Sequence, residues 1–316
     1  MTQTPKLLIV GSINKDIIFY GPHGTEMKLN GCLVFDSCGS FNGGKGANQA
    51  AAAAALGAES YLVGAVGQDQ NGQEMLRALN GLHVHTDYVL ETPEAQTGLS
   101  AIFTMPGGSY IGTNVLGANQ CITPDMVREA LDAQPFHMVL MQLEMPLETV
   151  YRTHELARER GLRVILDAGP AKKIDLSRLK GIYMISPNEA ETEALCGIMP
   201  ADEASVQAAA QAIYREAQPQ YVLLKLGGRG AYLYDGREGR SFPAFHVHCV
   251  DSTGAGDVFS GTLMTAMSQG MPMDRAIVYA NCAASLSVTK SGVTESIPTI
   301  EEVNALFTKV CMERGM

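Results

Sequence analysis

The sequence predicts an α/β protein with a doubly wound, mostly parallel sheet, helices on both faces and a small β-sheet lid. From residue 124 onwards, short apolar runs alternate with helical patterns, which is typical of β-α-β units in a parallel sheet. Residues 15–40 and 86–116 break this rhythm with strand-like segments that no helix separates. The length of 316 residues suits one large domain with an appendage. We therefore expect a single domain over residues 1–316, with lid segments at about 15–40 and 86–116 inserted in it.

The first part of the chain supplies strands and two helices. The alanine-rich segment 46–56 ends at Gly57, which predicts a helix with a C-terminal glycine, and residues 70–80 predict a second helix. Residues 106–109, Pro-Gly-Gly-Ser, predict a hairpin turn. The predicted strands cover residues 6–13, 17–20, 61–66, 88–90, 99–105 and 110–116.

The second part of the chain alternates between helical and strand patterns. Helices are predicted over residues 124–131, 147–160, 189–196, 203–216, 255–268, 273–289 and 299–310. Strands are predicted over residues 138–141, 163–167, 183–185, 221–225 and 231–234. We expect these strands to lie side by side with the helices packed on both faces.

Composition and charge exclude several classes of protein. Hydrophobic residues make up 46% and charged residues 18%, as in an ordinary globular protein. The net charge of −10 disfavours nucleic acid as a partner. Seven dispersed cysteines without a Cys-x-x-Cys pair argue against a disulfide framework or a zinc site, and we expect buried thiols. With no signal peptide and no apolar run of membrane-spanning length, we expect a cytoplasmic protein.

The strongest local motif is Asp251-Ser-Thr-Gly-Ala-Gly-Asp257, which follows a predicted strand and opens an apolar helix. Gly254, Ala255 and Gly256 are small enough for a phosphate to approach the N–H groups and the positive dipole end of that helix. Asp257 would stay ionised beside this positive site and would accept a proton from an alcohol during phosphoryl transfer. The alternative is a plain glycine turn in which Asp257 favours the helix dipole.

Two further segments suggest ligand contacts. Residues 39–46 nearly match the P-loop pattern, but Gly46 lacks the hydroxyl that binds magnesium, so a P-loop NTPase is disfavoured. Its glycines still allow close approach, and Lys45 with Asn48 would hydrogen-bond ligand hydroxyls. Asn14 and Asp16 follow the first strand two positions apart, so their side chains share one face. Such a pair suits vicinal sugar hydroxyls, although isolated Asn and Asp residues are more often turn formers.

Together these motifs resemble the ribokinase family of carbohydrate kinases, also called the PfkB family. The resemblance runs from Val10 to Pro298 and rests on two widely separated blocks, Gly-Gly-Lys-Gly-Ala-Asn-Gln-Ala at 43–50 and Gly-Ala-Gly-Asp at 254–257. Shorter matches are Gly-Ser-Ile-Asn-Lys-Asp at 11–16, Gln-Leu-Glu at 142–144, Pro-Asn-Glu-Ala-Glu at 187–191 and Leu-Gly-Gly-Arg-Gly at 226–230.

The resemblance implies a role for each matching position. Asp257 corresponds to the catalytic base. The sugar-binding positions are Asn14, Asp16, Gly44, Lys45, Asn48 and Glu144, covered by lid residues Ser100, Ile102 and Asn114. The positions implied for ATP, magnesium and phosphate are Asn188, Glu191, Lys225, Gly227, Gly230, Gly256 and Asn281. The positions implied for an activating monovalent cation, usually K⁺, are Asp251, Thr253, Ser287, Lys290, Gly292 and Ser296.

We therefore expect an ATP-dependent sugar kinase that uses Mg²⁺ and K⁺, with a homodimer formed through the lids. D-ribose, phosphorylated on its primary hydroxyl, is the first expected substrate. Deoxyribose, another pentose, a ketohexose and a nucleoside stay open, because residues 21–27 depart from the family's usual lid motif. Asp167-Ala-Gly-Pro and Lys225 also depart from the residues common in the family. The alternative of another class is a catalytically silent sugar-binding protein on the same fold.

Overall fold

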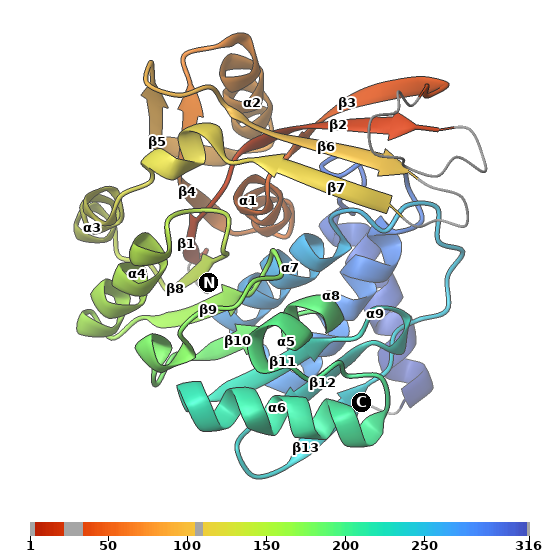
Figure 1. Cartoon of the computed structure of the whole chain (residues 1–316). Helices are drawn as coiled ribbons and strands as arrows, with labels where there is room; N and C mark the ends of the chain where they lie inside the picture. The colour runs from red at the N-terminus through yellow and green to blue at the C-terminus, as the bar shows by residue number, and fades with distance from the viewer. Residues whose placement is uncertain (1–3, 22–33, 105–109, 315–316) are drawn as a thin grey trace.

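The computed structural model describes residues 4–21, 34–104 and 110–314 and contains two sheets (Figure 1). The larger sheet has nine strands in the order β13-β12-β11-β10-β9-β8-β1-β4-β5. In chain order these strands are β1 (Lys6–Val10), β4 (Glu59–Gly67), β5 (Val84–Thr92), β8 (Met138–Met141), β9 (Arg163–Asp167), β10 (Met184–Ser186), β11 (Tyr221–Lys225), β12 (Ala231–Tyr234) and β13 (Gly239–Phe242).

The order of the strands creates a switch point between β1 and β8. From β1 the chain moves outwards to β4 and β5, and from β8 it moves in the opposite direction to β9, β10 and β11. All of these pairings are parallel, and β12 and β13 continue the sheet in antiparallel fashion. In open α/β sheets, ligands bind outside the carboxyl ends of the strands at such a switch point.

Helices cover both faces of the large sheet and bury two apolar cores (Figure 1). One core contains side chains of α1 (Lys45–Ala55), α2 (Gln70–Gly81), α7 (Ala255–Ser268), α8 (Met273–Ser287) and α9 (Ile300–Arg314). The other contains side chains of α3 (Pro124–Ala133), α4 (Leu147–Glu159), α5 (Glu189–Cys196) and α6 (Glu203–Ala217). Short 3₁₀ turns lie at Gly117–Cys121, Leu176–Leu179 and Gly227–Arg229.

The alanine-rich sequence of α1 has a packing reason. Ala47 and Ala50 to Ala53 are all buried, and α1 packs against both β4 and α7. Small side chains allow this close approach, and a Cβ at Gly261 of α7 would lie only 2.6 Å from the carbonyl oxygen of Gln49. The start of α1 is therefore held next to the start of α7, and the motifs at 43–50 and 254–257 meet.

The small sheet is the lid and has the order β3-β2-β6-β7. Its strands are β2 (Asn14–Tyr20), β3 (Ser37–Gly43), β6 (Gly98–Thr104) and β7 (Tyr110–Val115). β2 follows β1 directly in the chain, and β3 leads directly into α1, so the lid is covalently continuous with the edge of the site. Figure 1 shows it projecting over the carboxyl ends of the large sheet.

The predicted fold class is confirmed, with local corrections. The lid was expected to include residues from 86 onwards, but β5 pairs with β4 in the large sheet. The strand β13 was not predicted, and no strand is found at residues 243–250 before Asp251. Cys38 and Cys249 are exposed, so the expectation of buried thiols was wrong for these two. The predicted turn at 106–109 and the atypical lid residues 22–27 lie outside the described residues.

In the described part of the chain, no helix combines the length and the apolar character needed to span a bilayer.

Candidate active site

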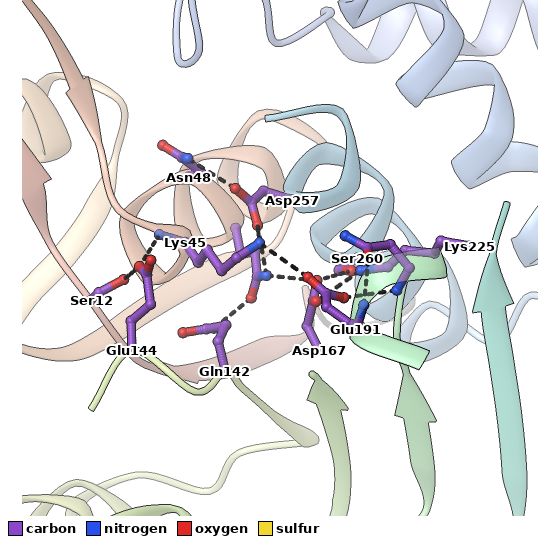
Figure 2. A network of polar contacts seen from close by, with 12 residues as sticks. Ser12, Lys45, Asn48, Gln142, Glu144, Asp167, Glu191, Lys225, Asp257 and Ser260 are labelled. Atoms are coloured by element: carbon purple, nitrogen blue, oxygen red, sulfur yellow. Dashed lines mark hydrogen bonds and ion pairs between the residues drawn. The ribbon is translucent and has the colours of Figure 1, made fainter. Parts of the chain in front are cut away.

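Five strands of the large sheet end in polar residues at the same edge. Ser12 follows β1, Glu144 follows β8, Asp167 ends β9, Asn188 follows β10 and Lys225 ends β11. The carboxyl ends of parallel strands meet at one edge of a sheet, so residues far apart in the sequence come together there. Figure 2 shows Ser12 and Glu144 on one side of a polar network and Asp167 and Lys225 on the other.

Glu144 is the centre of the first group of contacts. Its Oε2 accepts hydrogen bonds from Ser12 Oγ at 2.5 Å and from Asn14 Nδ2 at 3.4 Å. The backbone N–H of Lys45 donates to the same oxygen at 3.4 Å. On the other oxygen, Oε1 accepts from Asn114 Nδ2 of β7 at 2.9 Å. We call Asn14, Asp16, Asn114 and Glu144 the lid-edge cluster.

Asp16 lies beside Glu144 with one oxygen left for a ligand. The residue is buried, and its Oδ1 has no hydrogen-bond partner in the described structure. Burial raises the pKa of Asp16 to about 6, with Glu144 and Asp257 adding to the rise and a hydrogen bond from Ser100 opposing it. A Cβ at Gly43 would lie 2.0 Å from Asp16 Oδ2, so only glycine leaves room for this carboxylate.

The start of α1 is shaped to approach the lid-edge cluster. Gly44 adopts a positive φ of 90°, and a Cβ there would lie 2.6 Å from the backbone nitrogen of Asn14. Glycine is therefore required at this position, because it adopts the positive φ easily and has no Cβ to clash with the backbone of Asn14. One turn later, Asn48 donates through Nδ2 to Asp257 Oδ2 at 3.0 Å, while its buried Oδ1 has no partner among the described residues.

Asp257 occupies the first turn of α7 and is almost fully buried. The helix begins at Gly254, which has a positive φ of 76° and no side-chain cap. The N–H groups of Ala255 and Asp257 donate to Ser252 O and Gly254 O, and in the described part of the chain no acceptor is found for the N–H of Gly256. Within the anion site predicted at 254–256, the N–H groups of Gly254 and Gly256 are therefore the ones without an acceptor among the described residues.

Lys45 stands between Asp257 and Glu191. Its Nζ lies 3.8 Å from Asp257 Oδ1 and 4.0 Å from Glu191 Oε1. Burial alone would lower the pKa of Lys45, but the surrounding carboxylates, Asp257 first, raise it well above its usual range. The ammonium is therefore permanently charged. It lies on the side of Asp257 that faces Glu191, away from Glu144, as Figure 2 shows.

Asp167 and Lys225 form a buried ion pair beyond Lys45. Lys225 Nζ lies 2.8 Å from Asp167 Oδ1, and Asp167 is fully buried. Asp167 Oδ2 accepts hydrogen bonds from Gln49 Nε2 at 3.0 Å and from Ser260 Oγ at 2.8 Å. Although burial opposes it, the nearby Lys225 and Lys45 hold the pKa of Asp167 below its usual value. We call Lys45, Asp167, Glu191, Lys225 and Asp257 the lysine–carboxylate network.

Asn188 and Glu191 form a capping box at the start of α5. The side chain of Asn188 accepts from the N–H of Glu191 at 2.9 Å, and Glu191 Oε2 accepts from the N–H of Asn188 at 2.8 Å. This reciprocal arrangement explains the spacing of the Asn-x-x-Glu motif in structural terms. Burial raises the pKa of Glu191, and the neighbouring Lys225 and Lys45 oppose that rise.

The residues expected along a nucleotide are more dispersed. Gly227 and Gly230 lie in the turn between β11 and β12 with positive φ values of 52° and 93°. Asn281 lies on α8, and its Nδ2 donates to Phe242 O at 3.2 Å. These three residues do not join the lysine–carboxylate network through any hydrogen bond in the described structure.

The predicted cation loops come together around Asp251. Its Oδ1 accepts from the N–H of Thr253 at 2.9 Å and its Oδ2 from the N–H of Gly292 at 3.4 Å. The hydroxyls of Ser287 and Ser296 donate to nearby carbonyls. The Nζ of Lys290 lies 3.1 Å from Glu302 Oε1. The atoms that these loops offer as cation ligands are oxygens, which suit a hard cation.

Among the described residues, no group of three or more His, Cys, Asp or Glu side chains is found that could hold a metal ion.

Comparison with known proteins decides the family. The family model described as pfkB family carbohydrate kinase matches residues 4–300. The chain belongs to the pfkB family of carbohydrate kinases. This pfkB-family chain is 35% identical over 298 residues to the ribokinase of Haemophilus influenzae, covering 94% of this chain and 96% of that protein. It is also 34% identical over 265 residues to the deoxyribokinase of Salmonella typhi, covering 83% of this chain and 86% of that protein.

A solved structure of a pfkB-family relative agrees in fold. The structure of Arabidopsis thaliana ribokinase complexed with ribose and ATP superposes with a TM-score of 0.85 at 30% sequence identity. The match covers 96% of this chain and 99% of that one. The resemblance stated from the motifs alone is therefore confirmed at the level of family and fold.

Several residues of the network were not predicted as part of the site. Gln49 bridges two carboxylates by donating to Asp257 Oδ1 and to Asp167 Oδ2, both at 3.0 Å. Gln142 Nε2 donates to Gln49 Oε1 at 2.5 Å and fixes its orientation. Both glutamines lie inside matched motifs, and both are fully buried. A polar residue within an otherwise apolar, buried run was the signal that would have identified them.

Proposed function

We propose that the protein is an ATP-dependent carbohydrate kinase that transfers the γ-phosphate of ATP to the primary hydroxyl of a pentose, with D-ribose as first substrate. The observation that carries this proposal is the position of Asp257. Its carboxylate is held by Asn48 and Gln49, lies 3.8 Å from Lys45 Nζ and stands in the first turn of an uncapped helix. It thus separates the lid-edge cluster from the positive groups of the lysine–carboxylate network.

The lid-edge cluster supports a sugar on one side of Asp257. Asp16 Oδ1 and Asn48 Oδ1 are buried acceptors without partners in the described structure, and sugar hydroxyls would donate to them. Asn14, Glu144 and the lid residues Ser100 and Asn114 would orient the ring. Ile102 faces the same way, because it pairs with Ile18, two residues beyond Asp16 on β2.

The positive groups support phosphate transfer on the other side. Asp257 would take the proton from the attacking hydroxyl as the oxygen–phosphorus bond forms. The N–H of Gly256, the dipole of α7 and the ammonium of Lys45 would stabilise the transferred phosphoryl group. The ATP nucleotide would lie along Gly227, Gly230 and Asn281, the positions implied by the resemblance.

The residues present fit the two cations of the family. Asn188 and Glu191 would organise magnesium through water and the ATP phosphates, where its charge would offset that of the phosphates. Asp251 with the loop oxygens of Thr253, Ser287, Lys290, Gly292 and Ser296 would hold K⁺ beside the start of α7. The side chain of Lys290 contacts Glu302, so Lys290 would contribute its backbone carbonyl to the K⁺ site.

We include a homodimer, a single kinase domain and a cytoplasmic location in the proposal. Strand alternation places Ile17, Phe19, Leu99, Phe103, Ile111 and Val115 on the lid face opposite Asp16. Phe19 and Phe103 stack at 5.0 Å, and Val115 is 61% exposed. A second lid would cover this apolar face. Sedimentation at micromolar concentration should give a dimer, and a Val115→Asp variant should shift it to monomer; monomer alone in the unaltered protein would refute this part.

The test of the activity is ADP release in a coupled assay. D-ribose should give the highest kcat/KM in a panel that also contains 2-deoxyribose, a ketohexose and a nucleoside, and potassium should raise the rate. Higher turnover with another member of the panel would correct the substrate. Absence of ADP release with every sugar, in the presence of Mg²⁺ and K⁺, would leave a sugar-binding protein on a kinase fold.

A further inference from the structure

The ion pair between Asp167 and Lys225 is a notable feature at the carboxyl edge of the large sheet. Asp167 ends β9 and Lys225 ends β11, so the lysine reaches across β10, which lies between these strands. A buried salt bridge contributes little net stability because both charges lose their hydration. A position with such a high desolvation cost therefore needs a reason other than folding.

The ammonium of Lys225 stands next to the start of α7. A Cβ built on Gly256 would lie 3.7 Å from Lys225 Nζ, which is the one described atom within 4 Å of it apart from the chain neighbours of Gly256 and the backbone of its own helix. Among the described residues, no acceptor is found for the N–H of Gly256. The lysine and this N–H thus border the same small space.

A second helix also begins near Lys225. The backbone N–H of Lys225 donates to Pro187 O at 2.8 Å, one residue before the Asn188 cap of α5. The starts of α5 and α7, with their positive dipole ends, therefore both lie near Lys225. Lys45 adds a second ammonium near Glu191 and Asp257, so two ammonium groups and two helix starts lie among the carboxylates of Asp167, Glu191 and Asp257.

Asp167 and Lys225 differ in burial and in the contacts they make. Asp167 is fully buried; its Oδ2 accepts hydrogen bonds from Gln49 and Ser260, and its Oδ1 lies 2.8 Å from Lys225 Nζ but accepts no hydrogen bond in the described structure. Lys225 has an ion pair to Asp167 alone and an 11% exposed side chain, and an ammonium carries three donors. Lys225 can therefore keep Asp167 and donate its other N–H groups to an anion at Gly256.

We propose that Lys225 is a catalytic residue that binds the terminal, transferred phosphate of ATP, and that Asp167 is its buried counter-ion, which aims the ammonium at Gly256. This proposal rests on the kinase function proposed above and extends it. In the reaction, the oxygen of the sugar forms a bond to the γ-phosphorus, the bond to the β-phosphate oxygen breaks, and Lys225 stays protonated while it stabilises the phosphoryl charge.

Two variants distinguish a phosphate-binding role of Lys225 from a purely structural role as the ion-pair partner of Asp167. Lys225→Met removes the charge and leaves Asp167 buried without its cation, so the variant should unfold more easily. Asp167→Asn combined with Lys225→Met removes both charges, and stability should return. The double variant thus tests the lysine without the penalty of an unpaired carboxylate.

Nucleotide binding gives a readout that needs no sugar. Calorimetry with Mg²⁺ should show that the double variant binds ATP and its β,γ-imido analogue about 10- to 100-fold more weakly than the unaltered protein, while ADP binding changes less than about threefold. In the ADP-release assay, kcat should fall about 100-fold. Asp167→Asn alone should keep the preference for ATP over ADP, because Lys225 remains.

The control removes a different lysine–carboxylate pair, which joins the neighbouring strands β1 and β4. Lys6 at the start of β1 lies 3.5 Å from Glu59 of β4, at the opposite end of the sheet. Lys6→Met should leave nucleotide affinities and kcat unchanged.

Three outcomes would overturn the proposal. Normal ATP affinity and kcat in the double variant would make Lys225 a structural ion-pair partner. Equal weakening of ATP and ADP would move its contact to the inner phosphates. Weakening in the double variant that Asp167→Asn alone reproduces would assign the effect to Asp167. If the unaltered protein binds ATP but phosphorylates no sugar, the kinase function fails while this test still decides the role of Lys225.

Discussion

The buried carboxylates on the two sides of Asp257 have different kinds of partner. In the lid-edge cluster, Asp16 and Glu144 are neighbouring carboxylates whose partners are hydroxyl, amide and backbone N–H groups, and Asp16 keeps an unpaired oxygen. In the lysine–carboxylate network, the carboxylates have two ammonium groups beside them. In the proposed function, a neutral ligand rich in hydroxyls would complete the first region, whereas an anion would bind beside the ammonium groups of the second.

The largest expected effect lies at the residue that the two regions share. Asp257→Asn keeps the shape and removes the base, so kcat should fall about 10²- to 10⁴-fold while sugar affinity stays within a few-fold. Steady-state kinetics and sugar binding by calorimetry measure the two quantities. The matched control is Asp274→Asn, which alters the first-turn aspartate of the next helix, α8. Equal losses in both variants would mean that Asp257 acts only on the helix dipole.

Substitution of Asp16 should affect sugar binding and folding stability differently. Asp16→Asn removes a charged acceptor, so the KM for sugar should rise about 10- to 100-fold with a smaller change in the KM for ATP. Ile17→Val, on the opposite face of the same strand, serves as control. A change confined to the KM for ATP would contradict the assignment of this cluster to the sugar.

The stability of the same variant has a predicted sign. The folded protein titrates Asp16 near pH 6 and the unfolded chain near 3.8, so the folded state binds the extra proton between these values. Stability therefore falls as pH rises from 4 to 6, and the cost, up to about 3 kcal/mol, is fully present at pH 7. Without sugar, Asp16→Asn should be more stable than the unaltered protein at pH 7 in urea unfolding, and the difference should vanish near pH 4.

The pH dependence of sugar binding is the next smaller effect. Because the pKa of Asp16 is about 6, sugar affinity should decline below pH 6 by at most tenfold per pH unit. In the other region, the surrounding carboxylates raise the pKa of Lys45 well above its usual range, so ATP affinity should vary less. Calorimetric titration of sugar from pH 5 to 8 measures the effect, and the slope should disappear in Asp16→Asn.

The smallest effect is expected at the surface. Lys290 and Glu302 are each 41% exposed, and such pairs contribute about 0–1 kcal/mol. Lys290→Ala should therefore change stability by less than about 1 kcal/mol and leave activation by potassium unchanged. Asp251→Ala, which removes the acceptor of two loop N–H groups, should abolish that activation. If Lys290→Ala abolishes it too, the lysine side chain takes part.

The sequence predicted the elements well and their partners less well. Apolar runs and glycine-terminated helices are local patterns, so most strands and helices were found within a few residues. The sheet to which β5 belongs depends on pairing with β4, and that pairing is not encoded in the segment itself. The polar edge strand β13 carries little apolar pattern, and the segment before Asp251 has alternation without a strand.

The candidate site shows the same limit. Asn14, Asp16, Asn48, Glu144 and Asp257 lie within recognisable motifs and were predicted, and the structure brings them together. Lys225 was predicted as a nucleotide-site position, whereas Asp167 was visible only as part of a departure from the family's usual residues. Their pairing depends on β9 and β11 lying two places apart in the sheet. The bridging role of Gln49 depends on the packing of α1 against α7, which no local pattern reveals.

The bond between Asn114 of β7 and Glu144 after β8 has a consequence for motion. It is a direct tie between the two sheets, so any rotation of the small sheet away from the large one must break it. In the proposed function, binding of a sugar to this carboxylate and rotation of the small sheet would be thermodynamically linked, each changing the free energy of the other by the same amount. Glu144 would then both recognise the sugar and connect the two sheets, so that admission of the substrate is coupled to closure through a single side chain.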